Sequence, residues 1–248
     1  MSKVKKGVFL SDIHMPDEIN LTPVFDYLKD LKPDIVILGG DIIDAKGLHG
    51  LDSRPATFFK KSWYKRDVEI LKGLLGKIQK IAPKAEVIYL EGNHEERYQR
   101  LMKKYPETFG GDFDLVRDAK PKGMKIKWIP YGTYKSFYML GDTVFLHGTV
   151  WPDIHAKKYA LDHTPYKCIY GHLHHFQSYT TRKALATMAP RYAVTAGCLS
   201  ETAPEWKKGA PNQWVNGFIS FTLTGKQVLP QIHLIENGRF YVGAKEYK

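Results

Sequence analysis

Long hydrophobic runs are missing from this chain of 248 residues. No stretch approaches the roughly 20 consecutive apolar residues that a membrane-spanning helix needs, so we expect no membrane partner. The apolar run from Gly7 to Leu10 is too short for the core of a signal peptide. We therefore expect a cytoplasmic protein.

Cysteine is scarce, with two in the whole chain. Cys168 and Cys198 stand in apolar, strand-like stretches, where buried and reduced thiols are the expected state. This pattern disfavours a disulfide, a cysteine nucleophile and a structural zinc site bound by thiolates.

Internal repeats, low-complexity tracts and long linkers are also missing, so we expect a single domain over residues 1–248. Acidic residues are few, because 26 Asp and Glu stand against 37 Lys and Arg, a formal net charge of +11. A field of that sign attracts phosphate-rich partners such as nucleic acid, although many basic proteins bind none.

Strands and helices alternate in the first half of the chain. Apolar runs predict strands, and apolar residues at helical spacing predict helices. The predicted strands are Val8–Ser11, Asp34–Leu38 and Glu86–Leu90, and the predicted helices are Thr22–Lys32, Ser62–Ile81 and His94–Lys104. This order is typical of a largely parallel sheet.

The second half is richer in strands, and one helix near Ala156–Asp162 interrupts them. A hairpin turn is predicted at Thr224–Lys226. The predicted strands are Lys125–Ile129, Lys135–Leu140, Thr143–His147, Lys167–Tyr170, Phe176–Thr181, Tyr192–Ala196, Gly217–Leu223 and Gln227–Ile235. We expect two packed sheets with helices outside them.

Carboxylates, imidazoles and one amide follow the apolar runs at several places. The segments are Asp12-Ile13-His14, Gly39-Gly40-Asp41, Asp44, Gly92-Asn93-His94-Glu95, His147-Gly148 and Gly171-His172-Leu173-His174. Open α/β sheets bind their ligands at the carboxyl ends of strands, so these side chains should gather at one edge. This mixture of ligands suits Mn, Fe, Zn or Ni. Two such ions about 3.5–4 Å apart are a known device for displacement at phosphorus.

In this order, the segments resemble the combined motif of the calcineurin-like metallophosphoesterase superfamily, over roughly Val8 to His175. Any one motif alone would be weak evidence, whereas five in order, each after a strand and with Gly40-Asp41 and Asp44 counted as one motif, are specific. The resemblance implies an α/β fold, a four-layer α/β/β/α sandwich of two mixed β-sheets flanked by helices. It also implies a metal site at the C-terminal ends of the strands.

The resemblance further implies roles for individual residues. Asp12, His14 and His174 would hold one divalent ion, Asn93, His147 and His172 a second, and Asp41 would bridge both. Manganese is favoured, with iron, nickel or zinc as alternatives. A hydroxide shared by the ions would attack phosphorus, and His94, oriented by Asp44, would assist the leaving group. Glu95 follows the same pattern, although a carboxylate at a helix start explains it equally well.

Histidines outside the motifs are expected to be ordinary, and these are His49, His155, His163 and His233. His175 directly follows His174, so extended backbone would turn its side chain to the opposite, polar surface.

Three further features could contact a substrate. Arg97 lies one helical turn beyond His94 and could clamp a phosphate oxygen, or it could be a solvated helix arginine. The segment Arg54–Arg66 interleaves basic and aromatic residues, which suits nucleic acid but also suits an amphipathic entry to the following helix. The segment Ser200–Gly217 could be a lid over the site or a packed connection, and we favour the connection.

Departures from the family pattern reduce the number of branches of the family to which the chain could belong. The Asp-Arg-Gly typical of protein serine/threonine phosphatases is replaced here by Asp44-Ala45-Lys46, which disfavours that branch. We hypothesise a di-metal phosphoesterase that hydrolyses a phosphodiester in nucleic acid or in nucleotides, cyclic nucleotides included. The alternatives are a phosphomonoesterase acting on small metabolites or phosphoproteins, and a non-catalytic nucleic-acid-binding protein on the same fold.

Overall fold

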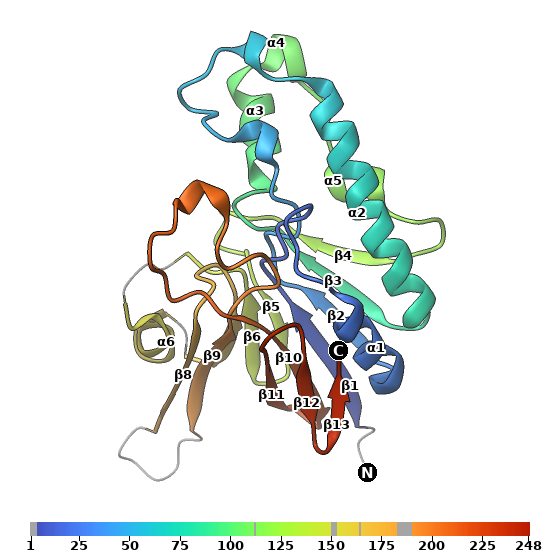
Figure 1. Ribbon diagram of the computed structural model, residues 1–248, viewed down its shortest axis with the longest axis vertical. Coiled ribbons are helices and arrows are strands. Elements are labelled where there is room, and N and C mark those ends of the chain that lie inside the picture. The colour runs from blue at the N-terminus through green and yellow to red at the C-terminus, as the bar shows by residue number, and fades with distance from the viewer. Residues whose placement is uncertain (1–3, 112, 150–152, 164, 183–189) are drawn as a thin grey trace.

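Two β-sheets pack face to face at the centre of the molecule, and helices cover their outer faces (Figure 1). The structure is a computed structural model that describes residues 4–248 apart from 112, 150–152, 164 and 183–189. The expected sandwich of two mixed sheets flanked by helices is confirmed.

The first sheet has six strands in the order β11-β10-β1-β2-β3-β4. Strands β1 to β4 are parallel, and β10 and β11 add an antiparallel edge beside β1. Their bounds are β1 (Lys5–Leu10), β2 (Ile35–Leu38), β3 (Glu86–Leu90), β4 (Ile126–Ile129), β10 (Asn216–Thr224) and β11 (Gln227–Ile235).

The second sheet has five strands in the order β5-β6-β7-β9-β8, with β6, β7 and β9 parallel. Their bounds are β5 (Tyr138–Leu140), β6 (Thr143–Leu146), β7 (Lys167–Tyr170), β8 (Phe176–Thr181) and β9 (Arg191–Ala196). A separate hairpin of β12 (Phe240–Val242) and β13 (Lys245–Tyr247) lies near the C-terminus.

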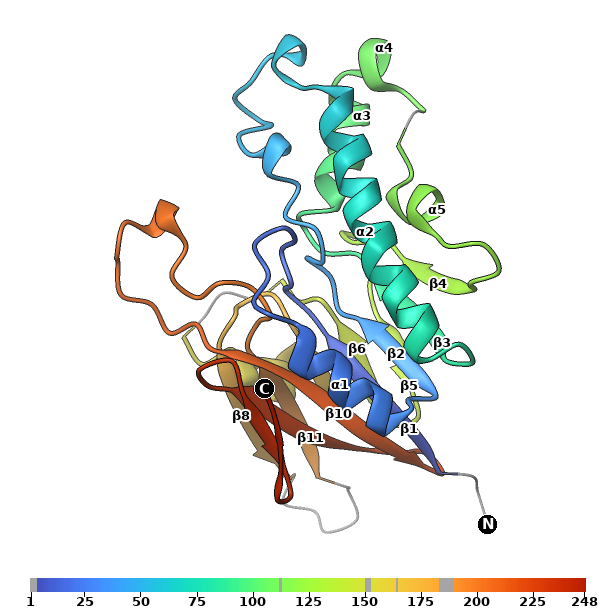
Figure 2. The ribbon, with the colours of Figure 1, turned by 45° about the vertical axis from the view of Figure 1, so that its right-hand side comes forward.

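The described helices are α1 (Thr22–Leu31), α2 (Lys61–Ile81), α3 (Glu96–Lys104), α4 (Pro106–Phe109), α5 (Leu115–Ala119) and α6 (His155–Lys158). Helix α6 continues as a π-helical turn over Tyr159–His163, and short 3-10 turns occupy Lys46–Leu48, Ala56–Phe58 and Glu205–Lys207. Both ribbon views show α3, α4 and the first half of α2 standing above the edge of the sheets (Figures 1 and 2).

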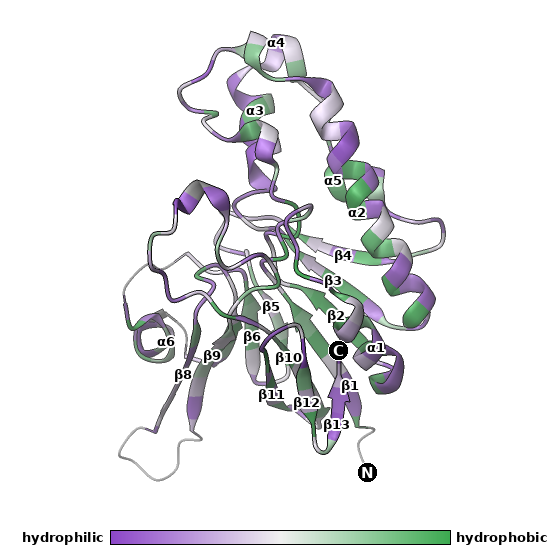
Figure 3. Ribbon diagram, viewed as in Figure 1, coloured by the Kyte–Doolittle hydropathy of each residue, from purple (hydrophilic) through white to green (hydrophobic). Residues whose placement is uncertain are grey.

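Alternation along β2 shows why the layers form. Ile35 and Ile37 join the core between the sheets, whereas Val36 and Leu38 join the core beneath the helices. A strand buried on both faces reads as a continuous apolar run, which is the pattern seen in the sequence. Figure 3 shows the same contrast, with hydrophobic colour along β2 and β3 and mixed colour on α2.

Several predicted element bounds differ from the structure. The strand expected at Lys135–Leu140 begins only at Tyr138, because Thr133 to Ser136 form a turn in which the Ser136 amide donates to the Thr133 carbonyl at 3.1 Å. The hairpin turn is confirmed, since Thr224 pairs with Gln227. Helices α4 and α5 and the β12–β13 hairpin were not predicted.

The longest described helix, α2, has 21 residues, but charged residues interrupt it throughout. None of the helices among the described residues could cross a membrane.

Candidate metal centre

The predicted ligands lie in loops at the carboxyl ends of parallel strands from both sheets. Asp12, Asp41 and Asn93 follow β1, β2 and β3 of the first sheet, and His147 and His172 follow β6 and β7 of the second. Because parallel strands end at the same edge, five loops that are far apart in sequence meet there.

The backbone of these loops is unusual. The φ angles of Asp12, His14, Asp41, His172 and His174 are 55°, 51°, 50°, 82° and 59°. Residues with a side chain rarely adopt positive φ, and such strain concentrates at functional sites. The strained conformations therefore mark the same residues that the sequence singled out.

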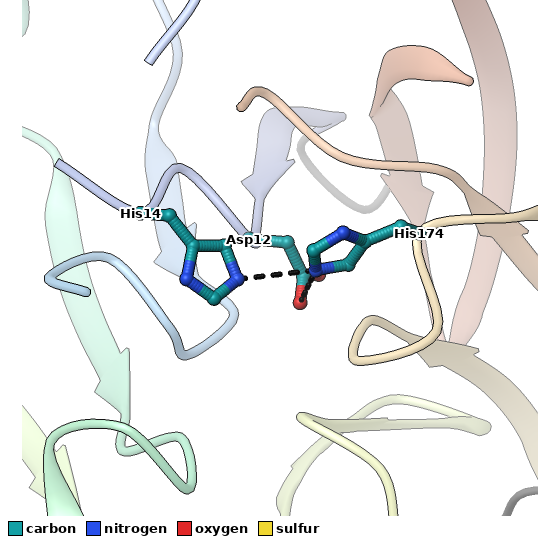
Figure 4. Close-up of side chains that lie close together, drawn as sticks. All are labelled: Asp12, His14 and His174. Atoms are coloured by element: carbon teal, nitrogen blue, oxygen red, sulfur yellow. Dashed lines mark hydrogen bonds and ion pairs between the residues drawn. The ribbon is translucent and has the colours of Figure 1, made fainter. Parts of the chain in front are cut away.

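One cluster of ligand atoms consists of Asp12, His14 and His174 (Figure 4). Nε2 of His14 lies 3.1 Å from Nε2 of His174, which lies 3.4 Å from Oδ1 of Asp12. All three residues are buried.

A second cluster consists of Asp41, His147 and His172, with Asn93 beside it. Nε2 of His147 lies 3.2 Å from Oδ2 of Asp41, 3.1 Å from Oδ1 of Asn93 and 3.3 Å from Nδ1 of His172. Asp41 also reaches the first cluster, because its Oδ2 lies 3.8 Å from Nε2 of His14.

These donor sets fit divalent ions. Nδ1 of His14 donates to Asp44 at 3.1 Å, and Nδ1 of His147 donates to the Gly39 carbonyl at 2.9 Å, so in each neutral ring Nε2 keeps a lone pair. Atoms that share an ion at about 2.1 Å lie about 3.0–3.4 Å apart at octahedral or tetrahedral angles. The spacings within both clusters are of this size, and the described residues place no thiolate among them.

Asp41 and Asp44 are held in their ionised forms. Burial acts to raise the pKa of Asp41, but the imidazoles of His147, His94 and His14 hold that pKa well below its ordinary value. Burial is likewise outweighed at Asp44, whose pKa is lowered by hydrogen bonds from His14, His49 and His94. Both residues therefore offer carboxylates over the whole physiological pH range.

His94 lies at the rim of the clusters. Its Nδ1 lies 2.7 Å from the Asp44 carbonyl oxygen and 3.1 Å from Asp44 Oδ1, and its backbone amide donates to Asp41 Oδ1 at 2.9 Å. Burial lowers the pKa of His94, but Asp41 and Asp44 more than offset this, so the pKa lies above its ordinary value.

Arg97 lies against the same imidazole. Its guanidinium nitrogens are 3.0 and 3.2 Å from the two ring nitrogens of His94, and one of them donates to the Asp44 carbonyl at 3.3 Å. Burial lowers the pKa of Arg97, but a guanidinium remains charged at any physiological pH. The side chain therefore carries positive charge to the rim of the cleft.

Glu95 fixes the loops rather than facing the cleft. Its Oε2 accepts from the amides of Asp41 and Gly92, and its Oε1 accepts from the amides of Ile42 and Ile43 and from the Tyr89 hydroxyl, at 2.6 to 3.1 Å. The residue is 2% exposed. Glu95 is therefore not simply a carboxylate that stabilises the start of a helix, which was one of the two roles expected for it.

A cleft of about 420 Å³ opens over both clusters. Its far wall includes His155, His175 and, from the segment Ser200–Gly217, Glu201 and Trp214. The ring of Trp214 lies 4.2 Å from that of His174. The segment Ser200–Gly217 therefore forms part of the cleft wall. It is more than the packed connection that we expect from the sequence.

Three histidines differ from expectation, and His155, which lines the cleft, is one of them. His49 lies with its Nε2 3.3 Å from Asp44 Oδ2 and its ring 5.8 Å from that of His94, so it belongs to the site. No motif marks it, and only its position five residues after Asp44 hints at this. His175 lines the cleft together with His174, because the left-handed backbone of His174 breaks the expected alternation.

Comparison with known proteins connects this geometry to a family. A sequence profile of the calcineurin-like phosphoesterases matches residues 6–196. Comparison with curated proteins finds no match.

Solved structures share the fold at low sequence identity. Vacuolar protein sorting 29 from Cryptosporidium parvum has a TM-score of 0.53 at 11% identity, covering 99% of this chain and 99% of that chain. Vps29 from Chaetomium thermophilum has a TM-score of 0.48 at 12% identity, covering 98% and 96%. Vps29 from Entamoeba histolytica, solved in complex with Zn²⁺, has a TM-score of 0.48 at 12% identity, covering 98% and 99%. The first of these likenesses supports the fold alone.

Proposed function

The chain belongs to the calcineurin-like phosphoesterase family, and from this premise we propose that it hydrolyses a phosphodiester in nucleic acid or nucleotides with two divalent ions. The observation that carries the proposal is the pair of Asp/His clusters joined by Asp41. Ligand atoms within each cluster lie within 4.8 Å of one another.

Each ion has its own ligand set in this proposal. Asp12, His14 and His174 would hold one ion, Asn93, His147 and His172 would hold the other, and Asp41 would serve both. Manganese is our first choice, with iron, nickel or zinc as alternatives for the same donors. Bound ions would supply Lewis acidity toward the phosphate oxygens and would lower the pKa of water.

His94 is the residue that we assign to the leaving group. Asp44 accepts from its Nδ1, so Nε2 can give a proton to the departing oxygen once the Arg97 guanidinium, 3.2 Å from Nε2, turns to the substrate phosphate. Its raised pKa favours the protonated ring that this role needs. Asp44 positions the ring, and its hydrogen bond with His14 ties that ligand to the same carboxylate.

Arg97 is our candidate for binding the substrate phosphate. Its guanidinium lies beside His94 at the cleft rim, where it could donate to a phosphate oxygen. The formal net charge of +11 supports a polyanionic substrate. Free, buried Cys168 and Cys198 accord with the cytoplasmic location that we propose.

The test is hydrolysis of bis(p-nitrophenyl) phosphate by metal-stripped protein to which Mn²⁺ is returned, beside p-nitrophenyl phosphate. We expect Mn²⁺-dependent turnover, faster on the diester. Asp41→Ala should abolish it by weakening metal binding. On a dinucleotide, whose alkoxide leaving group needs a proton, His94→Ala should lower kcat by about 10²- to 10⁴-fold with metal content retained.

Asp26→Ala is the matched control, because Asp26 is a half-exposed aspartate of α1 that pairs only with Lys29 among the described residues. It should keep full activity. Faster turnover of the monoester would favour the phosphomonoesterase instead. If the protein hydrolyses neither the diester nor the monoester, the proposal of a general phosphoesterase activity is wrong.

A further inference from the structure

A second groove lies beside the cleft. It has a volume of about 460 Å³, and its lining includes Lys46, His49, Arg54, Phe58, Trp63 and Arg66. We call it the basic groove. Most of these residues come from the loop between β2 and α2 and from the start of α2.

The basic groove is continuous with the metal centre. His49 lines both the groove and the cleft. The groove also includes Pro16 and Lys46, which stand two residues after His14 and Asp44. A chain that passes through the cleft can therefore extend directly into the groove.

Two cations in the groove are available to a ligand. Among the residues that the structure describes, neither Arg54 nor Arg66 forms an ion pair, whereas Lys46 pairs with Asp17 at 2.6 Å. The groove also contains the carboxylate of Asp67, which is 7% exposed and accepts from the Tyr98 hydroxyl at 2.6 Å. The accessible charge is therefore mainly positive, which suits a phosphate backbone.

Aromatic surface lies between these cations. The Arg54 guanidinium sits 4.6 Å from the centre of the Phe58 ring, which is 38% exposed, and the Trp63 ring lies 5.7 Å from Phe58. Trp63 packs on the backbone of Gly47, where an added Cβ would come within 2.3 Å of the indole. The two rings meet edge to face at 67°, so Trp63 supports the partly exposed Phe58 ring, on which an unpaired base can stack.

We propose that the basic groove binds nucleotides adjoining the scissile phosphodiester of a single-stranded nucleic acid. The inference rests on the proposed function, because it assigns a substrate to that site. Arg54 and Arg66 would contact backbone phosphates, and Phe58 with the overlying Arg54 would stack on a base. A paired base would be hidden inside a duplex, so a single strand fits better than a double one. An acidic peptide would use the charges but not the stacking surface.

The test measures binding of fluorescein-labelled 12-mers of oligo(dT) and oligo(U) to the metal-free protein by fluorescence anisotropy. The double variant Arg54→Gln with Arg66→Gln should weaken binding at least about 10-fold. It should also reduce the slope of log Kd against log salt by about 1.4, the value for two lost phosphate contacts on a single strand. Phe58→Ala should weaken binding on the order of 10-fold through lost stacking.

Lys65→Gln is the matched control, since Lys65 is exposed, neighbours Arg66 and lines a different hollow with Tyr64 and Val68. It should bind like the wild type. Phe58→Leu keeps apolar bulk without an aromatic face, so it replaces Phe58→Ala if that variant unfolds. DNA and RNA strands are compared in parallel, and binding of either one supports the proposed role of the basic groove.

Binding that survives the double arginine variant, or that Lys65→Gln weakens equally, would overturn the proposal. The proposal would also be overturned if poly-glutamate bound as tightly as the oligonucleotides and the Phe58 variants bound like the wild type. Charge alone would then explain the affinity. Failure of the wild type to hydrolyse bis(p-nitrophenyl) phosphate would refute the proposed function separately, since the binding measurement needs neither metal nor turnover.

Discussion

Glu95 is a single side chain on which the geometry of the metal loops depends. Its two oxygens accept five hydrogen bonds, four of them from backbone amides of Asp41, Ile42, Ile43 and Gly92. Asp41 is the carboxylate that joins the two clusters, so a change at Glu95 acts on the centre without removing any ligand.

Glu95→Gln should destabilise the protein. If Oε1 keeps its three donors, the side-chain NH₂ group introduced by Glu95→Gln would replace Oε2 and face the backbone N–H groups of Asp41 and Gly92, which then have no acceptor. Each unsatisfied buried donor costs about 1–3 kcal/mol. We expect the free energy of unfolding, measured with urea, to fall by about 2–4 kcal/mol.

The neighbouring Glu96→Gln provides the control. Glu96 lies 3.9 Å from Arg100 and holds none of these loops, so its change should stay within about 0.5 kcal/mol. Equal losses for the two variants would refute the special role of Glu95.

The meeting of the motif residues at one edge of the sheets could be predicted from the sequence, because they follow apolar, strand-like runs. The contacts of Glu95 could not, since they span more than 50 residues along the chain for three of its five partners. His49 was missed for a similar reason, because only the folded loop brings it to Asp44. His175 was misplaced because the positive φ of His174 is not visible in the sequence.

At the scale of elements, α1, β10 and β11 meet around a buried histidine. Tyr27 of α1 donates to Ser220 of β10 at 3.0 Å, and Ser220 lies 2.8 Å from Nε2 of His233 on β11. The Ser220 hydroxyl can then donate its proton to Nε2 of His233, which fits a neutral ring that accepts. Burial lowers the pKa of His233 to about 4.

This histidine should make stability depend on pH. The unfolded chain binds a proton at this position near pH 6.5, whereas the folded chain binds it only near pH 4, so stability falls as the pH drops between these values. Replacing His233 by Gln removes this contribution. Between pH 8 and pH 5, the wild type should lose about 1–2 kcal/mol more unfolding free energy than His233→Gln.

Urea unfolding at both pH values measures the difference, and the variant serves as the reference for all other titrating groups. Parallel pH profiles for the two proteins would show that His233 does not stay neutral in the folded state.

Elements with long periodic patterns could be predicted, and short ones could not. The 21 residues of α2 carry a clear apolar stripe, and central strands such as β2 and β7 are apolar runs. Helix α5 has five residues, and β12 and β13 have three each, too few to show a period. Such elements depend on packing, as when Tyr247 of β13 stacks on Phe240 at 5.1 Å.

At the scale of the whole molecule, the centre exists only when the two sheets pack together. Asp12, Asp41 and Asn93 come from the first sheet, and His147, His172 and His174 come from the second half of the chain. The layered architecture could be predicted through the resemblance, because alternating strands and helices alone do not specify how two sheets pair. The basic groove needed the structure, since its wall joins loops after β1 and β2 to the start of α2.

The central claim is that this packing builds a site for two ions, and the most direct test counts them. Metal-stripped wild type and Asp41→Ala would be dialysed against Mn²⁺, and the bound metal would be measured per chain by mass spectrometry. We expect two ions per chain in the wild type and fewer in Asp41→Ala, because Asp41 contacts both clusters. A wild type that binds fewer than two ions, or a variant that binds as many as the wild type, would contradict it.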